Sequence, residues 1–296
     1  MRAVLDVGTN SVRLLLARIH SDRVEPLLRE VRVTRLGQGT DASGELREDA
    51  MVRTLDALGE LVALIPPGTP TAIFATSAVR DAKNKGQFVE LVREALGLQL
   101  EVLSGIAEAE LSFRGALASF EGVELADPIT VVDIGGGSTE IYTGRTSGEL
   151  LGGGSLQIGA VRLLERYGDG LPAPEEIAGI LLPLAKKNLA FQPQTLVAVG
   201  GTATSLAAIE QELLHYDDEQ VMGFAFSLGE LESCYMKLVR LSLEERRRIS
   251  SLQAGREDVI VYGAAILVEA ARLLGFSRIL VSTGDLLTAR LLSLEC

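Results

Sequence analysis

The chain has 296 residues, of which 47% are hydrophobic and 23% charged, the proportions of a globular protein long enough to form two domains. Its formal net charge of −12 argues against a nucleic-acid partner, because binding to a phosphate backbone depends on a surface rich in Lys and Arg. A small anionic ligand remains compatible with that charge if a few Arg side chains, backbone N–H groups and a divalent cation hold it. No apolar run is long enough to span a membrane. With only two cysteines, the composition favours a cytoplasmic protein without a disulfide framework.

The first half of the chain reads as a strand meander followed by alternating helices and strands. Apolar runs at 3–7, 12–19 and 24–32 predict three strands, and a Gly-Thr-Asn-Ser turn joins the first two. Helical spacing of apolar residues predicts a helix over 49–65, which ends at Pro66-Pro67-Gly68. The same patterns predict strands at 71–76 and 98–103 and helices at 86–96 and 107–120.

The opening pattern recurs 127 positions later. Leu5–Ser11 and Val132–Ser138 share the order apolar, Asp, apolar, Gly, two further small residues and Ser. Both copies begin a predicted hairpin, so we expect two domains of the same topology over 1–122 and 123–296. The final helix, 286–294, is expected to pack back onto the first domain.

The second half mixes strands and helices in the same way, which gives the α/β class. Strands are predicted at 129–134, 139–143, 150–158, 195–199 and 278–282. Helices are predicted at 174–189, from 203 onward, and at 228–241, 243–252, 258–274 and 286–294.

Each Asp-Gly turn is a candidate phosphate site. A glycine-rich bend lets backbone N–H groups point into one concavity and bind phosphate oxygens. A carboxylate at the preceding strand end, Asp6 or Asp133, can bind Mg²⁺. The alternative is a tight hairpin with a structural Asp. A third glycine element, Gly200-Gly201-Thr202, would present a helix N-terminus to an anion, or be an ordinary turn capped by Thr202.

Three further residues are candidates for catalysis or binding. Glu108 lies in the first turns of a helix after a strand and is the leading general base, although a glutamate there also favours the helix N-terminus electrostatically. Glu140 could return a second carboxylate to the metal, or face solvent. Arg80 could clamp a phosphate bidentately, or form a surface ion pair with Asp81. With two histidines, neither near these motifs, a catalytic triad or a His-rich metal centre is disfavoured, and the known nucleotide fingerprints are missing.

Taken together, these motifs resemble the exopolyphosphatase / guanosine pentaphosphate phosphohydrolase family, which belongs to the superfamily of actin, sugar kinases and heat-shock ATPases. The resemblance covers almost the whole chain, and its order is specific. It rests on Asp6–Leu14, Ala75–Ala82, Leu103–Gly105, Glu108-Ala109, Val132–Glu140 and Gly255–Ile260.

The resemblance implies two ribonuclease H-like domains of the actin-like ATPase fold, with the active cleft between them. It makes Glu108 the catalytic base. It implies that Asp133 and Glu140 bind Mg²⁺ or another divalent cation, and Asp6 is a further candidate ligand for that metal. The phosphate-contacting positions are Gly8, Asn10, Ser11, Arg80, Gly136, Gly137 and Ser138, to which we add Gly201 and Thr202 from the third glycine element.

Two departures from the family pattern stand out. The family often has two glutamates after the Ser-Gly, but here the first position is Ala107. Near the C-terminus, Asp285–Ala289 replaces the common Gly-Leu-Arg-Glu-Gly, which puts that segment's contribution to the site in doubt. By this resemblance, we expect the chain to represent the short, two-domain form of the family.

The resemblance predicts hydrolysis of terminal phosphoryl groups of inorganic polyphosphate, with guanosine pentaphosphate as a second substrate. A homodimer is a family-level expectation, and the charge and apolar pattern predict neither nucleic acid nor a membrane as a partner. Two other functions stay open: an ATP-dependent kinase of the same superfamily, and a non-catalytic sensor of phosphate or an alarmone.

Overall fold

The computed structural model describes residues 1–20, 23–120, 122–168 and 170–293, and the chain divides into two compact units. Unit 1 comprises Met1–Leu111 with Leu286–Cys296, and unit 2 comprises Ser112–Asp285. The division falls inside helix α5 (Gly105–Ala118). The domain limits expected from the sequence, 1–122 and 123–296, stay a prediction.

Unit 1 is built on a five-stranded sheet with the order β3-β2-β1-β4-β5. The first three strands form an antiparallel meander, and β4 and β5 continue the sheet in parallel to β1. The strands are β1 (Arg2–Val7), β2 (Ser11–His20), β3 (Arg23–Val33), β4 (Thr71–Ala75) and β5 (Leu100–Val102). The helices are α1 (Thr40–Ser43), α2 (Glu48–Ala63), α3 (Ser77–Asp81), α4 (Lys85–Leu96), the start of α5, and α13 (Leu286–Ser293).

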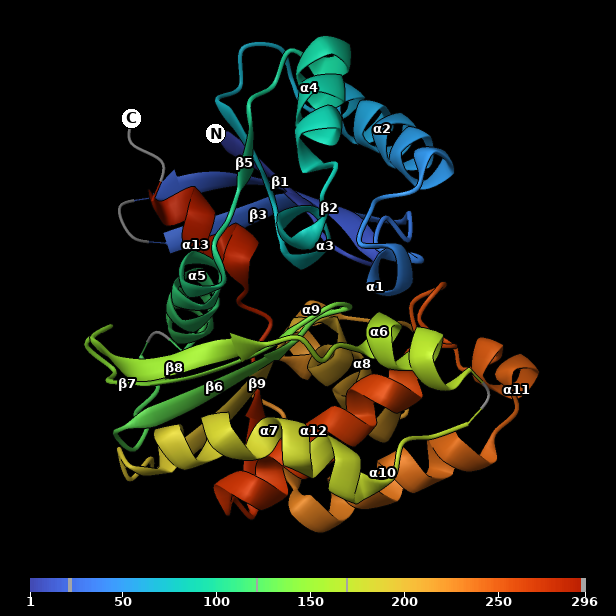
Figure 1. Ribbon diagram of the computed structural model, residues 1–296. Coiled ribbons are helices and arrows are strands. Elements are labelled where there is room, and N and C mark those ends of the chain that lie inside the picture. Colours follow the sequence, from blue (N-terminus) through green and yellow to red (C-terminus); the bar gives the residue numbers. More distant parts are fainter. Residues whose placement is uncertain (21–22, 121, 169, 294–296) are drawn as a thin grey trace. The chain divides into compact units, whose positions relative to one another are not determined.

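Both faces of this sheet are covered, because successive side chains of a strand point to opposite sides. Leu5 and Val7 of β1 pack into a core with α2 and α4, whereas Val4 packs on the other face with Leu287 and Leu291 of α13. Figure 1 shows α2 and α4 on one side of the strands and α13 on the other. Asp6, two residues after Val4, therefore lies on the α13 face.

Unit 2 contains a six-stranded sheet with the order β10-β11-β9-β6-β7-β8. Its strands are β6 (Ile129–Ile134), β7 (Thr139–Gly144), β8 (Leu150–Leu156), β9 (Thr195–Val199), β10 (Ala225–Ser227) and β11 (Arg278–Val281). Its helices are α6 (Ala160–Tyr167), α7 (Pro174–Leu189), α8 (Gly200–Glu210), α9 (Asp218–Val221), α10 (Leu228–Arg240), α11 (Leu243–Arg247) and α12 (Ile260–Leu274). Within the described residues, one large apolar cluster joins one face of the sheet to α7, α8, α10 and α12.

The two sheets share one topology. In each, three antiparallel strands are followed by two that run parallel to the first, so that β8-β7-β6-β9-β11 repeats β3-β2-β1-β4-β5. Unit 2 adds β10 antiparallel to β11. The fold-class prediction, α/β with two similar ribonuclease H-like domains, is confirmed.

The helix boundaries differ from the prediction by more than two residues at two places. Helix α8 begins at Gly200 rather than Ala203, so Gly200, Gly201 and Thr202 form its first turn and Thr202 is not its cap. Glycine has a low helix propensity, which is why the pattern placed the start too late. Helix α11 ends at Arg247 instead of 252, although no glycine or proline marks a stop before Gly255.

Five elements were not predicted: four contain only three to five residues and are too short for a periodic signal, and the fifth, α6, has eight. They are α1, α3, α6, α9 and β10. The predicted last residue of the final helix, 294, lies outside the described residues. No helix in the described ranges is long and apolar enough to cross a membrane.

Candidate active site

The turn between β1 and β2 is closed by one backbone hydrogen bond. The Gly8 N–H donates to the Ser11 carbonyl at 3.0 Å, and a Cβ on Gly8 would lie only 3.0 Å from that oxygen, so the tight turn favours glycine. Asn10 and Ser11 are buried. The buried Asn10 Oδ1 has no hydrogen-bond partner among the described residues. Because buried polar atoms are nearly always paired, this amide is suited to a ligand.

The turn between β6 and β7 repeats that geometry in unit 2. The Gly135 N–H donates to the Ser138 carbonyl at 3.0 Å, and the Ser138 side chain is buried. The N-terminus of α6 packs on this turn, since the Gly136 carbonyl accepts hydrogen bonds from the N–H groups of Val161 and Arg162 at 2.9 and 3.1 Å. The structure thus places Gly136, Gly137 and Ser138 in one turn, as it does Gly8, Asn10 and Ser11.

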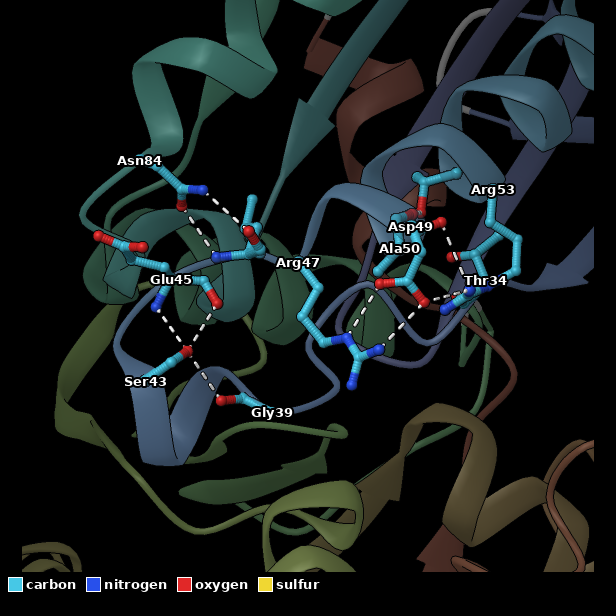
Figure 2. A network of polar contacts seen from close by, with 11 residues as sticks. Thr34, Gly39, Ser43, Glu45, Arg47, Asp49, Ala50, Arg53 and Asn84 are labelled. Carbon is cyan, nitrogen blue, oxygen red and sulfur yellow. Dashed lines mark hydrogen bonds and ion pairs between the residues drawn. The ribbon is translucent and has the colours of Figure 1, made fainter.

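A polar network fixes the segment between β3 and α2 against the first turn. The Asn10 carbonyl accepts hydrogen bonds from the Thr34 and Arg35 N–H groups at 3.0 and 2.9 Å. Figure 2 shows Arg53, whose Nε donates to the Thr34 carbonyl at 2.9 Å, and Asn84, whose side chain pairs with the backbone of Leu46. Hydrogen bonds therefore hold one end of the segment on the turn and the other end on the residue that precedes α4.

Glycine 159 is required by the second turn, and this gives a stability prediction. A Cβ at Gly159 would overlap the backbone of Gly136 and Gly137. We expect Gly159→Ala to lower the free energy of unfolding by about 1–3 kcal/mol, as overpacking does, and to reduce phosphate release.

The matched control for this prediction is Gly179→Ala. Gly179 is a helical residue of α7 with open space around its Cβ position, so the change should be neutral or stabilising by up to about 1 kcal/mol. Urea unfolding of the three proteins measures both effects. A Gly159→Ala protein as stable as the parent would contradict the packing argument.

Asp6 has an arginine as its cross-strand partner. Asp6 pairs with Arg13 in the β1–β2 register, and the Arg13 Nε and Nη2 atoms donate to Asp6 Oδ2 at 2.9 and 2.5 Å. The carboxylate of the first turn thus already faces an internal cation. Asp6 as a metal ligand stays a prediction.

Asp133, the corresponding residue of unit 2, faces a carboxylate. Asp133 is paired with Glu140 in the β6–β7 register, and Glu140 with Ser155 in the β7–β8 register. Partners in an antiparallel register point to the same face, with Cβ atoms about 4.5–5.5 Å apart. Two buried carboxylates therefore lie side by side on the sheet.

The Asp133–Glu140 pair fits a divalent cation. Among the described residues, no group of three or more His, Cys, Asp or Glu side chains is gathered to hold a metal on its own. Mg²⁺ nevertheless uses one or two protein carboxylates and completes its shell with water and substrate phosphates. Like charges directly opposite on a sheet are destabilising, so a cation would also relieve this pair.

Arg80 and Glu108 form an ion pair in unit 1. Glu108, in the first turn of α5, accepts a hydrogen bond from Arg80 Nη1 at 2.5 Å, while Arg80 Nε lies 3.5 Å from Asp81 Oδ1. The side chain of Glu108 is 9% exposed and that of Arg80 16%. An exposed ion pair with Asp81 therefore does not describe Arg80 fully, because its guanidinium also holds and orients Glu108, the candidate base.

Gly201 and Thr202 lie in the first turn of α8, where Arg256 covers the glycine. A Cβ at Gly201 would overlap the Arg256 guanidinium. Nearby, the Tyr216 hydroxyl donates to Asp218 Oδ1 at 2.7 Å. Burial, with help from the Asp218 charge and against the effect of Arg256, raises the pKa of Tyr216 above its ordinary value. The neutral phenol of Tyr216 and the guanidinium of Arg256 therefore lie near the N-terminus of α8.

The sequence analysis did not select four residues that the structure places in contact with the candidate site residues. They are Arg13, Ser112, Ser155 and Arg256. A signal for one of them existed: Arg13 follows Asp6 by the same seven positions by which Glu140 follows Asp133. Ser112 carries no such signal, because its partner Asp133 lies 21 residues away on another element.

Comparison with known proteins identifies the family. The model of the Ppx/GppA phosphatase family matches residues 15–288. The chain belongs to the Ppx/GppA phosphatase family. It is 34% identical to exopolyphosphatase 2 of Mycobacterium tuberculosis, over 99% of this chain and 98% of that protein.

Solved structures of the family agree with this assignment. An exopolyphosphatase from Cytophaga hutchinsonii superimposes with a TM-score of 0.88 at 29% identity, over 98% of this chain and 96% of that one. The Aquifex aeolicus member of the Ppx/GppA family superimposes with a TM-score of 0.77 at 30% identity, over 98% and 96% of the two chains. The family resemblance drawn from the motifs is confirmed.

Proposed function

We propose that this Ppx/GppA phosphatase is an exopolyphosphatase that hydrolyses the terminal phosphoryl group of inorganic polyphosphate and releases orthophosphate. The observation that carries the proposal is the Arg80–Glu108 pair, a nearly buried carboxylate held by a guanidinium at 2.5 Å at the start of a helix. Support also comes from the full-length similarity to proteins named exopolyphosphatases. Guanosine pentaphosphate is proposed as a second substrate.

In this proposal Glu108 accepts the proton of the attacking water, and Arg80 orients Glu108 and balances charge near the phosphoryl group. The glycine-rich turns, Gly8–Ser11 and Gly135–Ser138, contribute backbone N–H groups to phosphate oxygens. Asn10 would add the N–H groups of its buried side-chain amide as donors to the phosphate oxygens.

Asp133 and Glu140 would hold Mg²⁺ or another divalent cation. Such a cation neutralises negative charge on phosphate oxygens when it is bound. The roles proposed for Gly201 and Thr202 are contacts to the substrate's phosphates at the N-terminus of α8. A homodimer in the cytoplasm stays a prediction.

The test is phosphate release from defined substrates. Protein with Mg²⁺ is incubated with polyphosphate, guanosine pentaphosphate, or ATP with a sugar alcohol, and orthophosphate and phosphorylated products are measured. We expect orthophosphate from polyphosphate, formed one residue at a time from the chain ends. Binding of polyphosphate without turnover would instead identify a sensor, and a phosphorylated alcohol would identify a kinase.

A further inference from the structure

Two serine hydroxyls hold the paired carboxylates of unit 2. Ser112 Oγ, on α5, donates to Asp133 Oδ2 at 2.5 Å, and Ser155 Oγ, on β8, donates to Glu140 Oε1 at 2.6 Å. Both distances are those of charge-assisted hydrogen bonds from a hydroxyl to a carboxylate. Each carboxylate thus has its own serine, supplied by a different element.

The two hydrogen bonds act on groups that are packed tightly enough to be oriented. Ser112 and Asp133 are 1% and 7% exposed, and Glu140 is 3% exposed. The other oxygen of Asp133, Oδ1, would lie 2.6 Å from a Cβ at Gly200. The backbone at Gly200 therefore confines one side of the Asp133 carboxylate while Ser112 binds the other.

Repulsion makes this orientation necessary. Asp133 and Glu140 are register partners on one face of the β6–β7 pair, where two like charges repel. Without a fixed partner, each buried carboxylate would rotate away from the other. A hydroxyl donor on each side stabilises its carboxylate by a hydrogen bond and holds that side chain in place.

We propose that Ser112 and Ser155 are positioning residues that hold Asp133 and Glu140 in the orientation in which the two carboxylates share one divalent cation. This inference rests on the proposed function, because it takes Asp133 and Glu140 as the metal-binding pair. Hydrogen bonds to metal-ligating groups commonly change metal affinity by about 10- to 100-fold. Ser112 and Ser155 are therefore expected to set the affinity for the cation rather than the affinity for phosphate.

The experiment measures Mn²⁺ binding to the substrate-free, full-length protein by electron paramagnetic resonance. Ser112→Ala and Ser155→Ala are each expected to weaken Mn²⁺ binding about ten-fold. Ser155→Thr keeps the hydroxyl on a strand that tolerates a β-branched side chain, so it should restore the parental affinity. Polyphosphate hydrolysis by the Ala variants should need more metal for half-maximal rate, with the KM for polyphosphate at saturating metal little changed.

The matched control is Ser205→Ala. Ser205 is fully buried in α8, and its hydroxyl has no hydrogen-bond partner among the described residues, so its loss should leave Mn²⁺ affinity unchanged. Thermal unfolding of every variant without metal shows whether a weakened affinity comes from a damaged fold. Two results would overturn the proposal. One is a two-fold or smaller change in Mn²⁺ affinity in both Ser→Ala variants, and the other is an equal loss of affinity in Ser205→Ala.

The same measurements separate the inference from the proposed function. Weaker Mn²⁺ binding in the Ser→Ala variants of a protein that releases no phosphate from polyphosphate supports the inference and refutes the function. Phosphate release by the parent together with unaltered Mn²⁺ binding in both variants refutes the inference and supports the function. A parent protein that binds no Mn²⁺ refutes the inference as well.

Discussion

Glu108→Gln is expected to lower kcat for polyphosphate hydrolysis by about 10²- to 10⁴-fold, the range that a positioned general base contributes. The substitution removes the proton acceptor but leaves a side chain of nearly the same size. Its amide oxygen can still accept the hydrogen bond from Arg80 Nη1, which lies 2.5 Å from the glutamate in the parent. KM should therefore change much less than kcat.

The control is Glu110→Gln, which removes one negative charge from the same helix two residues further on. Glu110 is likewise a glutamate near the start of α5, so a general effect of removing negative charge from this end of the helix would appear in both variants. Steady-state phosphate release gives kcat and KM, and binding of polyphosphate to each variant is followed separately. If Glu108→Gln keeps more than a tenth of the parental kcat, Glu108 is not the base.

Local chemistry made much of the fold predictable. The Asp-Gly turns at Asp6 and Asp133 are each encoded within about seven residues, and both close with the same hydrogen bond, Gly8 to Ser11 and Gly135 to Ser138. Their recurrence was enough to predict two units of one topology. The start of α8 was harder to predict from the sequence, since glycine at 200 and 201 signals a turn rather than a helix.

The site was harder to predict than the fold, because its contacts join residues that are far apart in the sequence. Arg80 and Glu108 are separated by 28 positions and Ser112 and Asp133 by 21, and periodicity carries no information about such pairs. The motifs therefore identified which residues to examine but not which would pair.

Asp6 and Asp133 show the same limit within the repeat. As sequence they are equivalent, and both were assigned to metal. The register of each hairpin separates them, because Asp6 faces Arg13 whereas Asp133 faces Glu140. The equal seven-residue spacing of Arg13 and Glu140 hints at this difference, and the strand pairing shows that one turn contains an internal ion pair and the other two carboxylates.

That contrast leads to a prediction in which stability and activity change in opposite directions. Glu140→Gln removes one of two like charges that face each other on the buried side of β6 and β7. Relief of the repulsion should raise the free energy of unfolding of the metal-free protein by about 0.2–1 kcal/mol. The hydrogen bond from Ser155 to Oε1, 2.6 Å long in the parent, can be kept by the amide oxygen.

Activity should fall by at least about 10- to 100-fold in the same variant, the range that loss of even a group supporting a metal ligand costs, because a carboxylate that would bind the divalent cation has been replaced by a neutral amide. A ligand that binds only the folded state raises its stability, so added Mg²⁺ should raise the unfolding temperature of the parent more than that of Glu140→Gln. The control is Glu149→Gln, which removes an exposed carboxylate near Arg145 and should change neither quantity appreciably. Loss of both stability and activity in Glu140→Gln would mean that Glu140 supports the fold, whereas gain of stability with loss of activity is the pattern of a charge kept for function at a cost to folding.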